Sequence, residues 1–231
     1  MIFFVKLKEI MKLQNYIKHQ WKLIVFAFLL INLSFTSSID WELRKSSNGI
    51  YVYTRQGIKS DIKEVRCVTN FQSNLKNLVY FIKDISAHPQ YIYKCKMSFI
   101  LKNVNDSELY YYHETAAPWP VANRYGVIYY KITQNKSTKV VTIKSNGILG
   151  MYPNQPDLVE VPALTATWTF TPKSDGTVDG EYYIYLNPGG NIPTWLINLF
   201  VVDGPYSTIT KMKEMLQNEK YNQCKVNFIK N

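Results

Sequence analysis

Hydrophobic and polar residues alternate through most of the segment between positions 97 and 186, which is the pattern of strands with one buried face. Tyrosine, isoleucine, valine and threonine dominate these runs, and all four favour strands. Short polar turns such as Asn105-Asp106-Ser107 separate the runs, so neighbouring strands should pair antiparallel. Together with a preceding hairpin, the predicted strands are Ile50–Arg55, Ile62–Phe71, Ser98–Val104, Leu109–Thr115, Tyr125–Thr133, Lys139–Ile148, Val159–Thr171 and Gly180–Leu186.

An apolar period of three to four residues predicts a first helix from Leu75 to about Ser86, with Ser73-Asn74 as its cap. His88-Pro89 follows and should end this helix. His88 is then expected in a surface loop. It is not expected to bind a metal, because no second histidine lies nearby in the sequence.

A second, long helix is predicted at the end of the chain. Pro193 suits its first turn, Gly204-Pro205 should bend or briefly break it, and it continues to about Asn218. Its buried side is expected to carry Trp195, Leu196, Leu199, Phe200, Ile209, Met212 and Leu216. Residues 221–231 are expected to form a poorly ordered tail.

Two segments depart from these patterns. Residues 39–46 should form a short helical or irregular start whose Trp41 and Leu43 dock onto the core. Gly150 to Pro162 contains three prolines and reads as a long loop over one end of the sheet. The order of hairpin, helix, antiparallel strands and terminal helix indicates an α+β fold. A curved sheet wrapped around a long apolar helix can leave a cavity between them.

The first 38 residues resemble an export signal. Lysines 12, 18 and 22 form a basic region, the apolar run from Leu23 to Leu33 has signal-peptide length, and cleavage is expected after Ser38. Met11 is an alternative start, and an uncleaved membrane anchor is the alternative to a cleaved signal. Residues 39–220 then form one domain, expected outside the cytoplasm, in the periplasm or secreted.

The 231-residue chain has a formal net charge of +10, of which five lysines and one glutamate in residues 1–38 account for +4. The remaining surplus is spread without a dense basic block. It is compatible with contact to anionic membrane surfaces and argues against a nucleic-acid partner.

Cysteine spacing indicates no zinc site, because Cys67, Cys95 and Cys224 form no CxxC or Cys/His motif. In an oxidising compartment one pair could form a disulfide. The other interpretation is that the cysteines are small buried hydrophobic residues.

The segment from Leu109 to Ile132 combines two aromatic strands, a Pro118-Trp119-Pro120 corner, the acid Glu114 and the base Arg124. Glu114 shares one strand face with Tyr110 and Tyr112. If that face is inward, the carboxylate is buried and has to be paired or protonated. It could then bind the hydroxyl or headgroup of a ligand, or it could pair with Arg124 or Tyr130.

Arg124 and Trp119 each have two interpretations. Arg124 could fix the corner by hydrogen bonds to local carbonyls or an acid, or it could contact a ligand. Trp119 could be a packing wedge between its prolines or a platform for a ligand.

Catalytic signals are weak. The sequence has no Gly-x-Ser-x-Gly elbow, phosphate-binding loop or metal-binding spacing. His113 is the one acid–base candidate beside Glu114, but adjacent residues of a strand point to opposite faces.

Four segments resemble the START domain, the lipid-transfer module named after the steroidogenic acute regulatory protein. They are GIYVYTR (49–55), FIKDISAHPQY (81–91), YYHETAAPWPVANR (111–124) and NPGGNIPTWLINLFVVDGP (187–205). The resemblance covers about Trp41 to Lys220. It implies a helix-grip fold, a lipid cavity under the terminal helix, a lid-like loop at residues 150–162 and no cofactor.

The resemblance also carries over two site residues. Glu114 matches an acid that lies in the cavity of sterol-binding members, and Arg124 matches the arginine of a recurrent Arg-Asp pair. The chain has Tyr125 in place of that aspartate, and Tyr130 where sterol binders have the basic partner of the cavity acid. The resemblance therefore implies lipid binding in general more than steroid specificity.

The sequence thus predicts a non-catalytic, monomeric binder or carrier of a lipid or sterol-like hydrophobic molecule, without metal or cofactor. One alternative is a cyclase- or hydrolase-like enzyme that uses Glu114 and Tyr130 for proton transfer. The other is a structural envelope protein whose cavity is filled by its own side chains. The candidate ligand-binding residues are Glu114, Tyr112, Tyr130, Arg124, Trp119, Trp195 and Leu199.

Overall fold

A ten-stranded, curved and almost entirely antiparallel sheet organises the computed structural model, which describes residues 40–58, 60–222 and 226–230. The predicted signal segment and Cys224 lie outside these residues. The strands follow the order β1-β2-β3-β10-β9-β7-β6-β5-β4, and β8 pairs in parallel with β6. Their bounds are β1 Glu42–Ser47, β2 Ile50–Arg55, β3 Glu64–Phe71, β4 Cys95–Asn105, β5 Glu108–Thr115, β6 Asn123–Gln134, β7 Val141–Ile148, β8 Leu158–Glu160, β9 Ala163–Pro172 and β10 Val178–Asn187.

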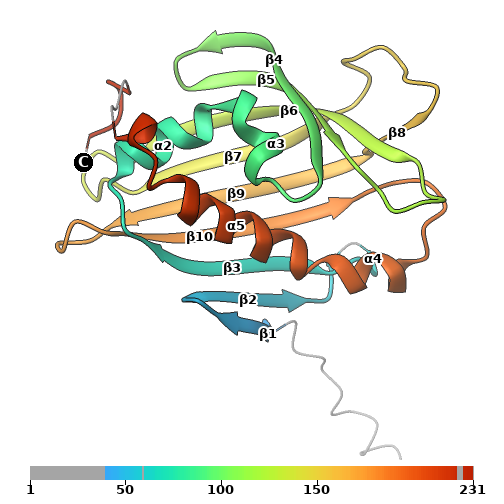
Figure 1. Ribbon diagram of the computed structural model, residues 1–231, viewed down its shortest axis with the longest axis horizontal. Helices are drawn as coiled ribbons and strands as arrows, with labels where there is room; N and C mark the ends of the chain where they lie inside the picture. Colours follow the sequence, from blue (N-terminus) through green and yellow to red (C-terminus); the bar gives the residue numbers. More distant parts are fainter. Residues whose placement is uncertain (1–39, 59, 223–225, 231) are drawn as a thin grey trace, which may run out of the picture. The chain divides into compact units, whose positions relative to one another are not determined.

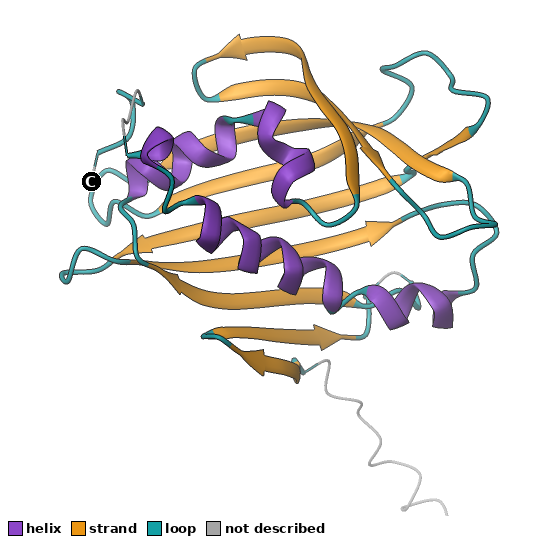
Figure 2. Cartoon of the chain, in the orientation of Figure 1, coloured by secondary structure: helices purple, strands orange, loops and turns teal. Residues whose placement is uncertain are grey.

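The helices lie on one face of this sheet (Figure 2). They are α2 Leu75–Lys83, α3 His88–Tyr91, α4 Thr194–Phe200 and α5 Asp203–Met215, with short 3₁₀ turns η1 Ile85–Ala87 and η2 Glu219–Tyr221. Figure 1 shows α5 crossing the sheet, with β1 to β3 on one side of it and α2 and α3 on the other. This arrangement is the predicted helix-grip fold. None of the helices in the described part is long and apolar enough to span a membrane.

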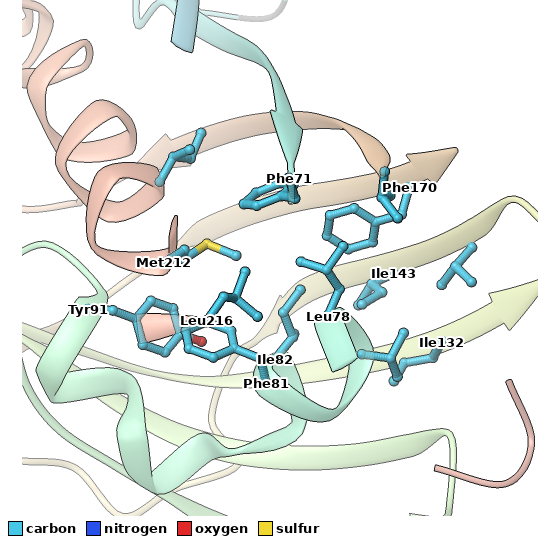
Figure 3. Close-up of a cluster of buried hydrophobic side chains, with 14 of the residues drawn as sticks. Phe71, Leu78, Phe81, Ile82, Tyr91, Ile132, Ile143, Phe170, Met212 and Leu216 are labelled. Atoms are coloured by element: carbon cyan, nitrogen blue, oxygen red, sulfur yellow. The ribbon is translucent and has the colours of Figure 1, made fainter. Parts of the chain in front are cut away.

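The core lies between the helices and the inner face of the sheet (Figure 3). Apolar residues of α2 and α5 pack there against every second residue of the strands, as the alternation predicts. The fully buried contributors include Leu78, Phe81, Met212, Phe71, Phe170 and Ile143. Each such side chain contributes about 1.5–3 kcal/mol relative to exposure, so this packing is the main reason why the helices stay on the sheet.

Helix α5 connects the two edges of the curved sheet. At its start, Asp203 forms an ion pair with Lys45 of β1, with 3.1 Å between Nζ and Oδ1. On its other side, the Thr208 hydroxyl accepts a 3.0 Å hydrogen bond from the backbone N–H of Tyr93, two residues before β4. The helix therefore closes the space that the sheet curves around.

The predicted strands are all present, but the start of the domain differs from the expectation. Residues 42–47 form a strand instead of a helical or irregular start, because Asn48 (φ 51°) and Gly49 (φ 66°) make a tight hairpin turn into β2. Trp41 packs edge-on against Tyr183 at 6.3 Å. Leu43 does not dock onto the core, since 53% of its surface is exposed.

The sequence suggested that His88 lies in a surface loop, but the structure buries it. The first helix ends at Lys83, and His88 begins the short helix α3, where only 3% of its surface is accessible. Its Nδ1 lies 3.2 Å from the hydroxyl of Ser98 on β4, which offers the buried imidazole a polar neighbour.

The loop from 150 to 162 and the terminal segment are more structured than predicted. The loop contains β8, so the expected strand from 159 to 171 is two strands. The terminal helix breaks at Val201-Val202, just before Gly204-Pro205, which lies in the first turn of α5. Tyr221, Val226 and Ile229 of the expected tail are buried in the core cluster.

Candidate functional site

Helix α4 is the most unusual element of the structure, because it is apolar and none of its residues is buried. Trp195 is 67% exposed and Leu199 is 60% exposed, although the sequence predicted both on a buried side. Exposed apolar residues are common singly, but a run of them on one helix marks a site of interaction.

Hydrogen bonds place α4 across one end of the sheet. The Asn198 side chain accepts from the N–H of Lys63 at 3.0 Å and donates to the carbonyl of Asp61 at 3.1 Å, both in the β2–β3 connection. The Phe200 ring centroid lies 5.7 Å from the ammonium of Lys94, next to β4. Figure 1 shows α4 at one end of the sheet, beside the end of β3 and the start of α5.

Along β9 and β10, the inner face of the sheet becomes more accessible towards α4. Along β9, Phe170 is fully buried and Leu164 is partly exposed. Along β10, Val178 is fully buried, Ile184 is partly exposed and Leu186 is exposed. The far half of the inner face is therefore a packed core. In the half near α4, β9 and β10 present partly or fully exposed apolar side chains, whereas Ile128 of β6 and Val65 of β3 are buried.

Tyr130 of β6 lies at the boundary between these halves. It pairs with Leu109 on one side and Ser145 on the other, and the register continues from Ser145 to Ala166 and then Ile184. Only 2% of Tyr130 is accessible. Its hydroxyl is the one buried side-chain oxygen or nitrogen of the described residues without a hydrogen-bond partner. A buried, unpaired hydroxyl costs roughly 1–3 kcal/mol, so it needs an explanation.

Other inward polar groups near this boundary are uncharged. Burial lowers the pKa of His113 to about 4 and that of His88 to about 3, so both imidazoles are neutral near pH 7. Burial also raises the pKa of the Tyr111 and Tyr182 phenols, and the proximity of the Tyr182 phenol raises that of Tyr111 further. The ring centroids of Tyr111 and Tyr130 are 6.1 Å apart.

Glu114 is buried, but on the outer face of the sheet, so its carboxylate does not lie on the side that the helices cover. Tyr111 belongs to the core cluster that the helices cover, and Glu114 has the opposite parity on β5. Its carboxylate pairs with Lys96 at 3.1 Å and accepts from the Asn123 amide at 3.1 Å. These are its partners in place of the predicted Arg124 or Tyr130.

Tyr112 lies on the same outer face as Glu114. Its ring stacks on Phe99 with centroids 4.9 Å apart and contacts Tyr152 at 4.7 Å. Tyr152 belongs to the loop from 150 to 162, so this part of the expected lid covers the outer face of β4 and β5, away from α4.

Arg124 ties the Pro-Trp-Pro corner to the turn that precedes α4. Its Nε donates to Pro188 O at 3.3 Å, its Nη2 donates to Gly189 O at 3.2 Å, and its Nη1 donates to Ala122 O. Burial lowers the pKa of this guanidinium. Gly190 has φ +68°, and a Cβ there would lie 3.2 Å from Nη2, so the turn fits closely around the arginine. These contacts are the hydrogen bonds to local carbonyls that one interpretation of Arg124 predicts.

Trp119 is 93% exposed, so it is not the packing wedge that the sequence suggested. The corner that carries it is fixed from within. The Asn123 side chain accepts from Ala117 N at 3.1 Å, and Val121 N donates to Pro118 O at 2.9 Å. A hydrogen-bonded corner therefore presents the Trp119 indole to solvent.

Comparisons with known proteins decide the family. No family model matches the chain. An uncharacterized protein of Pseudomonas aeruginosa is 30% identical over 175 residues, which cover 75% of this chain and 85% of the relative. The crystal structure of a STAR-related lipid transfer protein from Xanthomonas axonopodis superposes with a TM-score of 0.72 at 30% identity, over 77% of this chain and 99% of that chain.

The chain belongs to the START family of STAR-related lipid transfer proteins. More distantly, the phosphatidylcholine transfer protein of Rattus norvegicus is 25% identical over 194 residues, which cover 78% of this chain and 85% of that protein. Human STARD10 has the same fold, with a TM-score of 0.70 at 15% identity over 85% of this chain and 81% of that chain.

Of the seven predicted site residues in this START domain, the structure brings only some to the α4 end of the inner face. Tyr130 lies on the inner face, Arg124 lies beneath the turn before α4, and Trp195 and Leu199 lie on α4 itself. Glu114 and Tyr112 lie on the outer face, and Trp119 lies in solvent. The sequence analysis missed Ser145 and Ile184, which the register of four strands puts in one row with Tyr130, and Leu164, which lies in the next row.

The neutral histidines predict a loss of stability in acid. An unfolded histidine titrates near pH 6.5, and these two titrate near 3 and 4 when folded. Their contribution is complete above pH 6.5 and falls as the pH drops below it, since only the unfolded chain then binds the protons. Between pH 6.5 and 5 each histidine should cost roughly 2 kcal/mol, measured by urea unfolding. His88→Gln and His113→Gln should each flatten this dependence, and an unchanged slope in both variants would contradict the assignment.

Proposed function

We propose that this protein binds a lipid between the inner face of its sheet and helices α4 and α5, and carries it between membranes without catalysing a reaction. The observation that carries the proposal is the apolar helix α4, without a buried residue, at the accessible apolar end of the sheet. A lipid chain placed there would cover Leu199 and Leu186 together.

The energetics favour such a ligand. Each methylene that leaves water contributes about 0.8 kcal/mol, so a tail of roughly twelve buried methylenes contributes about 10 kcal/mol before the costs of association. The same binding event would remove exposed apolar surface of α4 from water. A small polar solute would gain neither contribution.

Two inner-face residues support an internal space. His113 and Tyr182 lie deep among protein atoms, as the strong effect of burial on their pKa values indicates. Both nevertheless keep partly accessible surface. Accessible surface on enclosed side chains is what the lining of a ligand cavity would have.

The relatives support the same function. The Xanthomonas protein is named as a STAR-related lipid transfer protein, and the rat protein as a phosphatidylcholine transfer protein. The present chain spans 99% of the former and 85% of the latter, so the match extends over nearly the whole of each.

The geometry argues against the enzyme alternative. Glu114 and Tyr130 lie on opposite faces of the sheet, so they could not transfer protons to one substrate. His113 and Glu114 are also on opposite faces, because they are adjacent in β5. The structural alternative is a protein whose interior is filled by its own side chains. Such a protein would bind no lipid, so lipid-binding measurements distinguish it from a carrier.

Movement of α4 offers a route for exchange. The helix is separated from α5 by Val201-Val202, and neither helix has a side-chain cap at its start. Asn198 supplies hydrogen bonds that hold it to the β2–β3 connection. A rotation at Val201-Val202 would lift α4 and leave the packed residues of α5 in place.

The same end of the molecule suits contact with a membrane. Lys94 accepts a 2.8 Å backbone hydrogen bond from Ala116, at the start of the Trp119 corner, and its ammonium lies near Phe200 of α4. Exposed aromatic residues beside a lysine favour an anionic interface. Because the sequence predicts an export signal, we propose that this activity takes place outside the cytoplasm.

Lipid uptake should depend on α4. Leu199→Ser should weaken uptake of a fluorescent phospholipid roughly tenfold, because the ligand loses one apolar contact, and should leave thermal stability unchanged because Leu199 is exposed. The matched control is Leu43→Ser, an exposed leucine on β1. Native mass spectrometry of protein from its host should reveal a bound lipid. Absence of lipid together with no uptake by the unmodified protein would contradict the proposal.

Membrane docking should depend on Trp119. Trp119→Ala should lower the affinity for vesicles containing anionic lipid roughly tenfold, measured by flotation, because an exposed indole no longer enters the interface. Uptake of a monomeric lipid analogue in solution should not change. The control is Tyr51→Ala, an exposed aromatic residue on the outer face of β2. Equal effects of both substitutions would show that the corner is not the docking point.

A further inference from the structure

The Tyr130 hydroxyl has no hydrogen-bond partner among the described residues. It is buried and unpaired within the described residues, whereas buried hydroxyls are normally hydrogen-bonded. Replacing tyrosine by phenylalanine would fill the same place without this cost. The hydroxyl therefore points to a polar group that the protein itself does not supply.

The position of Tyr130 indicates where that group would lie. On β7, β9 and β10, the inner row that contains Tyr130, Ser145 and Ala166 separates the packed rows around Ile143 and Phe170 from the more accessible row of Leu164 and Leu186. A ligand that lies over the accessible rows would have its inner end at Tyr130. Ser145 of β7 pairs with Tyr130 of β6 and offers a second hydroxyl. The Cβ atoms of such a pair are about 5 Å apart.

The surroundings of Tyr130 are uncharged. At the inward positions of the described strands, its polar neighbours are the phenol of Tyr111 and the hydroxyl of Ser145. The next inward residue on β5 is His113, which is neutral near pH 7. Asp84, the acid whose charge reaches the buried phenol of Tyr91, is paired with Lys220 and accepts from the hydroxyl of Tyr221. A charged group beside Tyr130 would lose its hydration without gaining a counter-ion.

Arg124 does not change this conclusion. It occupies an inward position of β6, six residues and roughly 20 Å along the strand from Tyr130. Its Nε, Nη1 and Nη2 each donate to a backbone carbonyl, so its charge is already engaged at the rim. The inner end of the site and its rim therefore differ in character.

We propose that the lipid held by this protein is uncharged, with a hydroxyl or carbonyl as its inner polar group, and that the Tyr130 hydroxyl forms a hydrogen bond with that group. The inference rests on the proposed lipid binding and narrows the class of lipid. It sets this chain apart from its relative in rat, which is named for a zwitterionic phospholipid.

Displacement of a fluorescent lipid by four probes of equal chain length tests the class. The probes are hexadecanol, hexadecane, palmitate and palmitoyl lysophosphatidylcholine, each with a single sixteen-carbon chain. Hexadecanol should bind more tightly than each of the other three. Tighter binding of palmitate or of the lysophosphatidylcholine would overturn the inference without affecting lipid binding itself. Failure of all four probes to bind would overturn both the inference and the proposed function.

Substitution of Tyr130 tests the residue. Tyr130→Phe should weaken hexadecanol binding about 2- to 10-fold, leave hexadecane binding unchanged, and keep or raise the melting temperature, since it removes an unpaired hydroxyl. Tyr129→Phe is the matched control, because Tyr129 is one position away on the outer face and its hydroxyl donates to Glu108 at 2.7 Å. Unchanged hexadecanol affinity in Tyr130→Phe would overturn the role of Tyr130. If that variant does not fold, the four-probe ranking of the unmodified protein still decides the class.

Discussion

The packing of α5 on the inner face of the curved sheet is the interaction on which the rest of the structure depends. Ile209 and Met212 are fully buried there, and Leu216 extends the contact to the end of the helix. Ion pairing at Asp203 and the hydrogen bond at Thr208 fix the helix to both edges of the sheet. Burial of this one helix face thus closes the fold and determines which part of the sheet stays uncovered.

The consequence is a division of the inner face into two halves. Below α5, rows of apolar residues pack as a conventional core, which supplies the stability of the domain. Near α4, β9 and β10 continue with apolar residues that are partly or fully exposed, and the Tyr130 hydroxyl at the boundary lacks a partner among the described residues. The less tightly packed half of this START domain stays folded because the packed half stabilises the sheet and Arg124 fixes the turn before α4.

The sequence predicted the strands and helices well, because alternation and helical periodicity record which residues pack. It could not decide which face of β5 the helices cover, since aromatic residues occupy both faces, so it left the face of Glu114 open. Tyr221, Val226 and Ile229 are too widely spaced to form a pattern, so the buried end of the chain was missed. The apolar pattern of α4 predicted a helix correctly and its burial wrongly, which is the kind of local conflict expected at a functional site.

The most direct test of the account is photocrosslinking with a lipid that carries a diazirine on its tail, followed by mapping of the labelled peptides. The account predicts adducts on the inner face near α4, at residues such as Leu164, Ile184 and Leu199, with no labelling of the outer-face residues Tyr112 and Tyr152. Adducts confined to the outer face, or scattered over the surface without preference for this end, would contradict it.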